Sequence, residues 1–500
     1  MTGIEIFCGI VAVLLLLYYY SISTHNFWKK RGVAGPEPTP FFGNVTRVMF
    51  SQLSMGQLLR EMYKKYKSNP VLGLFARREP ILIINDPELI KTILIKDFAK
   101  FSNRGITVNE KAEPLSQHLF ALEPERWRPL RARLSPVFTS GRLKEMFFMI
   151  IDCSKSLEEH LEAVAVKGDP VDCRDLTSRF TTDVIGTCAF GINMNCSSDM
   201  ESEFRKVGKQ FLATSLMRVI RARIREIAPG FYTLFARVLP RPFGTDFFMD
   251  SVLNMIEYRK KNNIVRNDFI NTLMDIREHP EKLGDIDLTD GLLTAQALIF
   301  FVAGFHSASA TISNALLEMA LNQDIQDKLR EEIKEHHKLN NGEWHFENIK
   351  AMPILDAVFK ETLRKYPALP FLSRKSVDDY TFEDLKFSIP KNTGVFIPVY
   401  GIQHDPDIYP NPEVFDITRF MGDAESKRHP MHYLPFGDGP RNCIGARFAI
   451  FQTKIGIIKT IRNYKVDTCE NTVFPCKFNP RAFLLVPTHP ITLKITKIKS

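Results

Sequence analysis

The ten-residue run from Phe436 to Gly445 constrains this chain more than any other segment, because it holds Cys443 in a glycine-rich loop. The stretch from Ala446 to Tyr464 behind the loop predicts a helix. A cysteine just ahead of a helix N-terminus gains backbone N–H donors and the positive end of the helix dipole, and both favour the metal-binding thiolate. With no second cysteine or histidine close by in the sequence, this thiolate cannot form a tetrahedral zinc or iron–sulfur site, but it can be the single protein ligand of a haem iron.

The rest of the run suits a large flat ligand that carries acidic groups. Gly439 and Gly445 remove side chains where such a ligand would meet the backbone, and Arg441 can offer a bidentate cation to a carboxylate. The run resembles the cysteine loop of the cytochrome P-450 family, the haem-thiolate monooxygenases, at Phe436, Gly439, Arg441, Cys443 and Gly445. The alternative is a buried structural cysteine, which we expect of most of the other seven cysteines because they form no CxxC pair.

The resemblance extends over residues 35–500 and implies haem b as the cofactor. It also implies a mainly α fold with a small β-rich part (α+β) near the N-terminal half. A chain that is 44% hydrophobic, with no Gly/Ser linker or repeat after residue 45, favours one large catalytic domain over residues 46–500. Two β-rich runs over residues 71–84 predict a hairpin, and residues 86–334 are predominantly helical in pattern.

The N-terminus predicts a membrane anchor. Residues 1–22 hold an apolar run of just the length that a spanning helix needs, roughly 17–25 residues. Lys29, Lys30 and Arg31 follow it, and positive charge on that side keeps the rest of the chain in the cytosol. We therefore expect a single transmembrane signal anchor in the endoplasmic reticulum membrane, with a basic and proline-rich hinge over residues 23–45 and a cytosol-facing catalytic domain.

The formal charge of +9 invites a nucleic-acid interpretation, but no nucleic-acid motif or basic–aromatic repeat accompanies it. Anionic lipid and an acidic redox partner explain the excess better. Because no dinucleotide-binding or phosphate-loop motif is present, electrons from NADPH must arrive through a separate partner, an NADPH–cytochrome reductase or alternatively a cytochrome b-type donor. Arg133 and Arg447 are candidates for docking its acidic surface.

Three further residues are expected to hold the cofactor. Trp127 and Arg131 are four apart, hence on one helix face, and can together hold a carboxylate; an amphipathic surface pair is the alternative. The family resemblance assigns both to the haem propionates. It also places Arg374, in the segment after Pro367, where a propionate-binding arginine is expected.

The segment from 289 to 321 is the longest helix candidate, and its apolar first half marks a buried helix. One face of this segment carries small side chains, as a flat ligand lying against it would require. These residues are Gly304, Ser307 and Ala308, extended by Ala303 and Thr311. The segment resembles the family's distal oxygen-binding helix, except that His306 and Ser307 replace the usual acid and threonine.

This replacement matters because oxygen activation needs two protons. Ser307 keeps a hydroxyl, and the unperturbed pKa of a histidine such as His306 suits neutral pH. Three alternatives stay open: a working variant relay with Ser307 and His306 as catalytic residues, a leaky oxidase that releases peroxide, or chemistry that needs no external electrons.

A structural lock is expected behind the cysteine loop. Glu361 and Arg364 lie on one helix face and can pair, although such pairs are common. In the family this pair locks with a second arginine, and here the candidate is Arg419, although Ile417 and Thr418 replace the usual Pro-Glu before it. We expect the trio to hold the cysteine loop against the core.

The resemblance implies an apolar substrate pocket, lined by Phe120, Phe300, Phe301, Ala303, Gly304, Leu369, Leu372 and Phe483. Such a lining indicates a lipophilic small molecule as substrate. The apolar run 227–235 is a core helix-loop or a segment that dips into the bilayer. The implied function is a monooxygenase of the branch that oxidises foreign compounds in insects. The alternatives are a haem-thiolate isomerase or dehydratase that acts on oxygenated lipids, and a non-catalytic haem- or lipid-binding protein.

Overall fold

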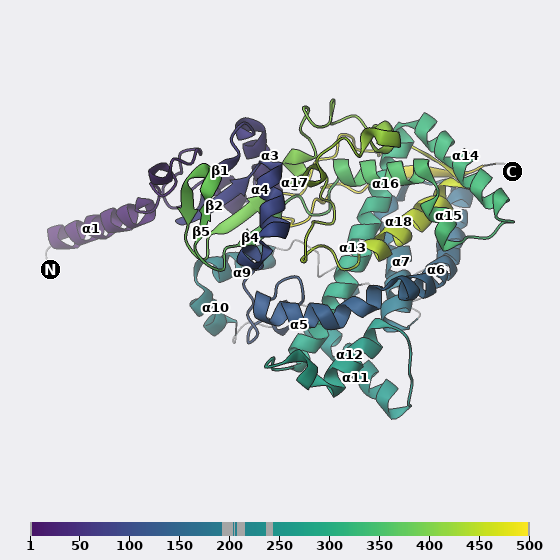
Figure 1. Cartoon of the computed structure of the whole chain (residues 1–500), viewed down its shortest axis with the longest axis horizontal. Helices are drawn as coiled ribbons and strands as arrows, with labels where there is room; N and C mark the ends of the chain where they lie inside the picture. The colour runs from purple at the N-terminus through teal and green to yellow at the C-terminus, as the bar shows by residue number, and fades with distance from the viewer. Residues whose placement is uncertain (1–2, 193–203, 205, 208–215, 237–243, 499–500) are drawn as a thin grey trace.

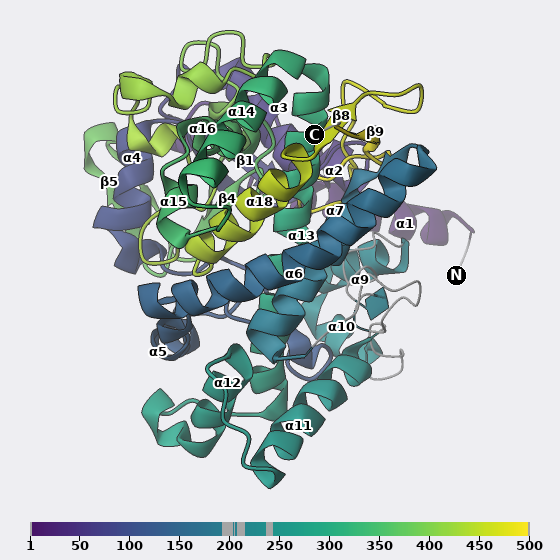
Figure 2. The same cartoon turned by 90° about the vertical axis from the view of Figure 1, so that its right-hand side faces the viewer.

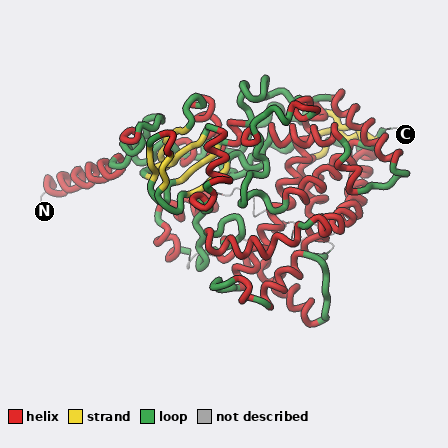
Figure 3. Tube along the Cα trace, in the orientation of Figure 1, coloured by secondary structure: helices red, strands yellow, loops and turns green. Residues whose placement is uncertain are grey.

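The computed structural model describes residues 3–192, 204, 206–207, 216–236 and 244–498. A helix-rich body forms most of the molecule, and the largest group of strands lies at the end from which the N-terminal helix projects (Figure 1, Figure 3). The mainly α fold with a small β-rich part is therefore confirmed. All seven cysteines within the described ranges are free thiols, and Cys196 lies outside those ranges.

The helices begin and end as follows: α1 Gly3–Ile22, α2 Thr46–Met49, α3 Met55–Tyr66, α4 Pro87–Lys91, α5 Pro124–Leu134, α6 Ser140–Lys167, α7 Cys173–Ile185, α9 Leu216–Ile227, α10 Pro229–Phe235, α11 Thr245–Lys261, α12 Phe269–Glu278, α13 Asp290–Leu321, α14 Gln323–Leu339, α15 Phe346–Lys350, α16 Pro353–Lys365, α17 Val399–Ile402 and α18 Ala446–Ile461. Four single-turn segments also bear on the site: η2 Thr92–Lys96, η4 Pro114–Ser116, η5 Ser135–Phe138 and η9 Ile417–Phe420.

The strands are β1 Val71–Ala76, β2 Glu79–Ile84, β3 Val171–Asp172, β4 Leu372–Lys375, β5 Tyr380–Phe382, β6 Phe387–Ile389, β7 Gly394–Ile397, β8 Tyr464–Asp467 and β9 Thr492–Lys497. They form sheets in the orders β1-β2-β7-β4, β3-β9-β8 and β5-β6. The expected hairpin is confirmed: β1 pairs antiparallel with β2, and its turn places Arg77 at a φ of 59°.

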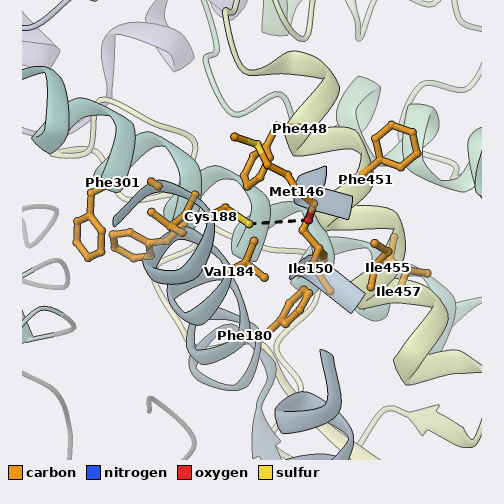
Figure 4. Close-up of a cluster of buried hydrophobic side chains, with 14 of the residues drawn as sticks. Met146, Ile150, Phe180, Val184, Cys188, Phe301, Phe448, Phe451, Ile455 and Ile457 are labelled. Atoms are coloured by element: carbon orange, nitrogen blue, oxygen red, sulfur yellow. Dashed lines mark hydrogen bonds between the residues drawn. The ribbon is translucent and has the colours of Figure 1, made fainter. Parts of the chain in front are cut away.

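The core of the helical body surrounds α13. The Thr289 side chain accepts the N–H of Leu292 at 3.1 Å and so starts this helix where the sequence predicts it. Helices α7 and α18 contact α13 directly, and α6 packs across α7 and α18 (Figure 2). Apolar side chains from all four helices meet in one buried cluster, in which the thiol of Cys188 lies 3.9 Å from the Met146 carbonyl (Figure 4).

The segment behind α1 is fixed to the hairpin. Trp28 is buried, and its indole N–H donates to the Leu74 carbonyl at 2.8 Å. Thr24 donates to the carbonyl of Arg78, whose guanidinium lies 3.5 Å from the centre of the Tyr20 ring. The expected hinge over residues 23–45 is therefore attached to the sheet. Helix α1 itself is exposed, and it is long and apolar enough to cross a membrane. Helix α13 is also long and apolar enough but is largely buried.

Two expectations about elements are wrong. Helix α18 ends at Ile461 instead of Tyr464, because Tyr464 begins β8, pairs with Lys497 of β9 and donates its hydroxyl to Glu162 at 2.9 Å. The β-rich part is also not confined to the N-terminal half. Strands β4 and β7 come from the C-terminal half and complete the sheet that β1 and β2 begin.

Candidate functional site

Cys443 lies at the end of a tight loop directly before α18. Its N–H donates to the carbonyl of Phe436 at 2.9 Å, and the N–H of Asn442 donates to that of Gly439 at 3.0 Å. The sulfur accepts the N–H of Gly445, which caps α18. The Cys443 side chain is solvent-accessible although protein surrounds it, so the sulfur forms part of the wall of an internal space.

The protein alone does not make Cys443 a thiolate. Burial raises the pKa of this thiol, and this effect exceeds the lowering by the Gly445 N–H and by the Arg131 and Arg104 guanidinium groups. The Gly445 N–H at the helix end favours the thiolate, as expected, but does not outweigh burial. A coordinated metal ion removes the proton from a thiol outright, so a bound iron would complete the stabilisation.

The loop glycines serve backbone contacts. A Cβ at Gly439, where φ is +74°, would lie 1.9 Å from the carbonyl oxygen of Leu94 in η2. A Cβ at Gly445 would lie 3.4 Å from the Phe138 ring, which is an ordinary contact. The prediction that these glycines make room for a flat ligand is wrong for Gly439, because what requires a glycine there is the neighbouring chain.

Four arginines gather beside the cysteine loop, and we call them the arginine cluster: Arg104, Arg131, Arg374 and Arg441. Arg441 is buried, lies with its guanidinium carbon 4.6 Å from the centre of the Trp127 ring, and donates to the carbonyl of Leu122. Arg131 donates to the carbonyl and to the side chain of Asn442, both at 3.0 Å. Arg104 donates to the Arg441 carbonyl at 2.7 Å. The structure thus brings the predicted Trp127, Arg131, Arg374 and Arg441 into one region.

Within the part of the chain that the structure describes, no carboxylate forms an ion pair with a member of the arginine cluster, although the nearby Glu123 opposes the lowering of the Arg441 pKa. Burial and the neighbouring guanidinium groups lower the pKa of Arg104, Arg374 and Arg441 to about 9. Among the described residues, Nε of Arg374 and both Nε and Nη1 of Arg441 are buried without a hydrogen-bond partner. Buried unpaired cations cost several kcal/mol, as a rough figure, unless an anion compensates them. The two propionates of haem b are such anions, so the residues present fit this cofactor.

Sequence reasoning missed Arg104. Arg104 belongs to the loop of residues 103–125. This loop has no helical or strand period from which the direction of its side chains could be predicted. Its place follows from tertiary pairing instead, because Asn103 bridges to Lys375 of β4 and the Arg104 carbonyl accepts the hydroxyl of Ser373 at 3.0 Å. Only the proximity of β4 shows that Arg104 is a neighbour of Arg374.

One strip of α13 stays accessible within an otherwise buried helix. Ala303 is exposed, and Ser307 and Ala310 are half-buried, at helical spacings of four and three. The predicted face was wrong in part. A Cβ at Gly304 would lie 2.3 Å from Cδ1 of Ile185 on α7, and Ala308 and Thr311 are buried. The small size of Gly304 therefore serves the α7–α13 contact.

The two predicted catalytic residues have different surroundings. The Ser307 hydroxyl lies on the accessible strip and donates to the carbonyl of Ala303 at 2.8 Å. His306 is buried, and Arg174 of α7 lies 3.1 Å from its Nε2. Burial and the Arg174 charge lower the pKa of His306 to about 3, so the expectation that it titrates near neutral pH is wrong.

Two of the predicted pocket residues, Phe120 and Phe483, come together from distant segments. The Phe120 ring lies 4.0 Å from the Arg104 guanidinium carbon and 6.3 Å from the centre of the Phe483 ring. Phe483 in turn lies 5.7 Å from Phe371, which precedes β4. Leu369 and Leu372 are half-buried near the same strand.

Two predicted pocket residues belong to the packed core instead. Phe301 is fully buried, and its ring contacts those of Phe190, Phe248 and Phe305. Phe300 packs 4.5 Å from the ring of Phe269. Phe301 lies two residues before Ala303, so the helical period turns it to a different side of α13. Phe300 is half-buried and packs against the rings of Phe138 and Phe269.

The predicted lock is present. Glu361 and Arg364 of α16 form a fully buried bidentate pair at 2.7 and 2.8 Å, and Arg419 of η9 lies 3.4 Å from the same carboxylate. Arg364 also donates to the Gln403 carbonyl, and the Gln403 side chain accepts the N–H of Leu434 at 3.0 Å. This path connects the lock to the start of the cysteine loop.

Fold and site together define a haem-thiolate protein, with one accessible cysteine at a helix end and a cationic cluster for the cofactor's carboxylates. The model of the Cytochrome P-450 family matches residues 33–495, and the chain belongs to this family, whose members are oxidoreductases of the monooxygenase type.

Curated relatives match nearly the whole chain. Probable cytochrome P-450 6a14 of Drosophila melanogaster is 40% identical over 97% of this chain and 98% of its own length. Cytochrome P-450 6A1 of Musca domestica is 38% identical over 98% and 97%. Cytochrome P-450 6j1 of Blattella germanica is 37% identical over 98% and 97%. The predicted resemblance to insect members of the family is confirmed.

Proposed function

We propose that this protein inserts one oxygen atom of O2 into a lipophilic small molecule, with electrons that originate from NADPH and arrive through a separate reductase. The observation that carries the proposal is the arginine cluster beside Cys443, in which Nε of Arg374 and Nε and Nη1 of Arg441 are buried without a hydrogen-bond partner among the described residues. Cys443 would hold the haem iron, and Arg104, Arg374 and Arg441 would hold the propionates. Bound haem supplies the oxygen-activating chemistry, and the chain supplies ligand, orientation and proton path.

The pocket supports a lipophilic substrate. Phe120, Phe371 and Phe483 form an aromatic wall near the arginine cluster, and Leu372 adds an aliphatic surface. Such a wall gains free energy from apolar area, about 25 cal/mol per Å2 buried. Foreign compounds of low polarity are therefore the substrate class that we propose.

Ser307 and His306 would divide the proton path between them. The Ser307 hydroxyl can rotate from the Ala303 carbonyl toward the accessible strip and there orient a water molecule. His306 is neutral at physiological pH, and Arg174 donates to its Nε2, so its single proton resides on Nδ1. His306 therefore serves as a fixed neutral group beside Ser307, which leaves the serine as the residue that moves a proton.

Exposed apolar residues support attachment to the endoplasmic reticulum membrane with the catalytic domain in the cytosol. Beside the exposed α1, the helices α9 and α10 expose Met217, Ile220, Phe231 and Leu234. The α10 end of the molecule lies on the same side as α1 (Figure 1). Arg447 is exposed near the cysteine loop and suits the acidic surface of a reductase, whereas Arg133 pairs with Asp275.

The experiment that tests the function is reconstitution of the holoprotein with a microsomal NADPH reductase. NADPH consumption, product and hydrogen peroxide are measured together over a panel of lipophilic probes. Product in proportion to NADPH supports the proposal, while peroxide alone, or no NADPH loss with any probe, contradicts it. Cys443→Ser should abolish the thiolate-type carbon monoxide spectrum, and Cys476→Ser, at a distant half-buried thiol, should leave it unchanged.

A further inference from the structure

A glutamine lies in the apolar half of α13, where a polar side chain is costly. Gln296 is fully buried among leucine and alanine residues of that helix. An amide without hydrogen-bond partners in such a place would cost about 1–3 kcal/mol. Its retention in the folded chain therefore requires specific partners.

Those partners belong to the 103–125 loop. The Gln296 amide nitrogen donates to the carbonyl of Gln117 at 2.8 Å and to that of Leu292, one turn earlier, at 2.7 Å. Its amide oxygen accepts the N–H of Leu119 at 2.8 Å. Because Leu119 offers a donor and Gln117 an acceptor, the orientation of the amide is fixed. Gln296 thus binds the backbone on both sides of His118, and we call this arrangement the Gln296 clamp.

The helix surface next to the clamp is shaped for the same loop. A Cβ at Gly291 would lie 3.0 Å from Pro114 and 3.3 Å from the side chain of Gln117. The η4 turn can therefore lie directly on α13. This contact fixes the position along the helix at which the loop reaches Gln296.

The clamped residues lead directly to the site. The carbonyl of His118 accepts the N–H groups of Ala121 and Leu122, at 2.8 and 3.1 Å, which forms a tight turn. The carbonyl of Leu122 accepts a hydrogen bond from Arg441, a member of the arginine cluster. Phe120, inside the turn, lies against the Arg104 guanidinium.

We propose that Gln296 is a positioning residue: through the Gln117 and Leu119 backbone it sets where Phe120 meets the substrate and where Leu122 holds Arg441. This inference rests on the proposed function for its effect on substrate, while the clamp itself can be tested without turnover. Gln296 itself is fully buried and lies two helical turns before Ala303, where the accessible strip of α13 begins.

The test compares Gln296→Leu with the unchanged holoprotein. Hydrogen exchange, followed by mass spectrometry, should show the Leu119 amide exchanging about tenfold faster in the variant, because one hydrogen bond and its buried acceptor are lost. With reductase added, the KM for O-dealkylation of 7-ethoxycoumarin should rise about fivefold while kcat changes less than about twofold, since ground-state positioning of the probe is lost. Unchanged Leu119 exchange would overturn the proposal.

Gln326 supplies a matched control. It is also fully buried, and its amide binds the backbone N–H and carbonyl of Val466 at 3.0 and 2.8 Å, far from the site in β8. Gln326→Leu should lower the melting temperature as Gln296→Leu does, yet leave KM and Leu119 exchange unchanged. An equal rise of KM in both variants would show a general loss of stability and overturn the specific role.

A conservative variant tests the chemistry of the clamp. A carboxyl group at a fully buried position is protonated at neutral pH, so Gln296→Glu keeps an acceptor for Leu119 and a donor for Gln117. It should restore slow exchange and a low KM. If Gln296→Leu does not fold, Gln296→Asn, one methylene shorter, takes its place with the same expected changes. Absence of turnover of every probe of the panel in the unchanged protein would contradict the proposed function and leave the exchange test of the clamp intact.

Discussion

At the scale of single residues, the surroundings of His306 decide its chemistry. In water a histidine gains its proton near pH 6.5, but in this protein burial and the Arg174 charge lower the pKa of His306 to about 3. Burial lowers the pKa of Arg174 as well, and the negative charge of Asp172 on β3 opposes that effect. The folded state therefore stabilises the neutral imidazole, and the unfolded state binds the proton more tightly.

This difference predicts how many protons the chain takes up when it unfolds. A pKa that is lowered on folding contributes stability above the unfolded value, near 6.5, which is lost as the pH falls toward 3. Near pH 5 the unfolded His306 is protonated and the folded one is not. His306→Gln, which keeps an acceptor for Arg174, should reduce proton uptake on urea unfolding at pH 5 by about one proton.

Potentiometric titration of unfolding measures this uptake, with His345→Gln at an exposed position as control. Equal uptake by His306→Gln and the unchanged protein would contradict the low pKa of His306.

Arg104 carries a second prediction at this scale. If it holds a haem propionate, Arg104→Leu removes a charge-assisted contact worth about 1.5–3 kcal/mol, and the rate of haem transfer to apomyoglobin should rise about tenfold or more. Absorbance spectra follow this transfer directly. Arg128→Leu, on the exposed side of α5, is the matched control and should leave the rate unchanged. Equal rates in all three proteins would remove Arg104 from the cofactor site.

At the scale of elements, the contact between η2 and the cysteine loop leaves no room for a side chain. Gly439→Ala would place its Cβ on the Leu94 carbonyl and would hold a non-glycine residue at a φ of +74°. The backbone conformation alone costs about 1–2 kcal/mol, and the loop must also move. We expect the variant to lose most of its thiolate-type carbon monoxide spectrum. Gly141→Ala in α6, where a Cβ would meet no atom within 4 Å, should keep it.

The elements also show what the sequence can and cannot predict. The range of α13 and the β1–β2 hairpin follow from local patterns, since hydrophobic runs, the Thr289 cap and the residues at the turn are all readable along the chain. Local patterns do not predict which side of α13 faces the site. The small size of Gly304 makes room for Ile185, which belongs to a helix more than a hundred residues earlier in the chain. Long-range packing likewise decides that α18 stops before Tyr464.

At the scale of the whole molecule, segments far apart in sequence share one sheet and one site. Strand β7 lies parallel to β2 and antiparallel to β4, which places Arg374 beside the loop that carries Arg104. The cysteine loop, recognised from five residues, anchors the site, but its partners become neighbours only through this sheet. The same sheet holds the segment behind α1, so Trp28 and Thr24 join α1 to the rest of the molecule.

The membrane surface can be tested on a chain that lacks the anchor. If α9 and α10 enter the bilayer as proposed, deletion of residues 1–22 should weaken binding to phospholipid vesicles without abolishing it. Phe231 and Leu234 are 58% and 62% exposed, and burying each contributes about 1.5–3 kcal/mol.

Phe231→Ser with Leu234→Ser in the shortened chain should therefore lower the partition coefficient about a hundredfold, as measured by vesicle flotation. The control replaces Phe148 and Val166, apolar residues at least as exposed as Phe231 and Leu234, and should leave binding unchanged. Both belong to α6, whose label lies on the other side of Figure 1 from that of α10. If both double variants bind the vesicles equally, α9 and α10 do not meet the membrane. The two variants each lose a pair of exposed apolar residues and differ in the helix from which that pair is lost.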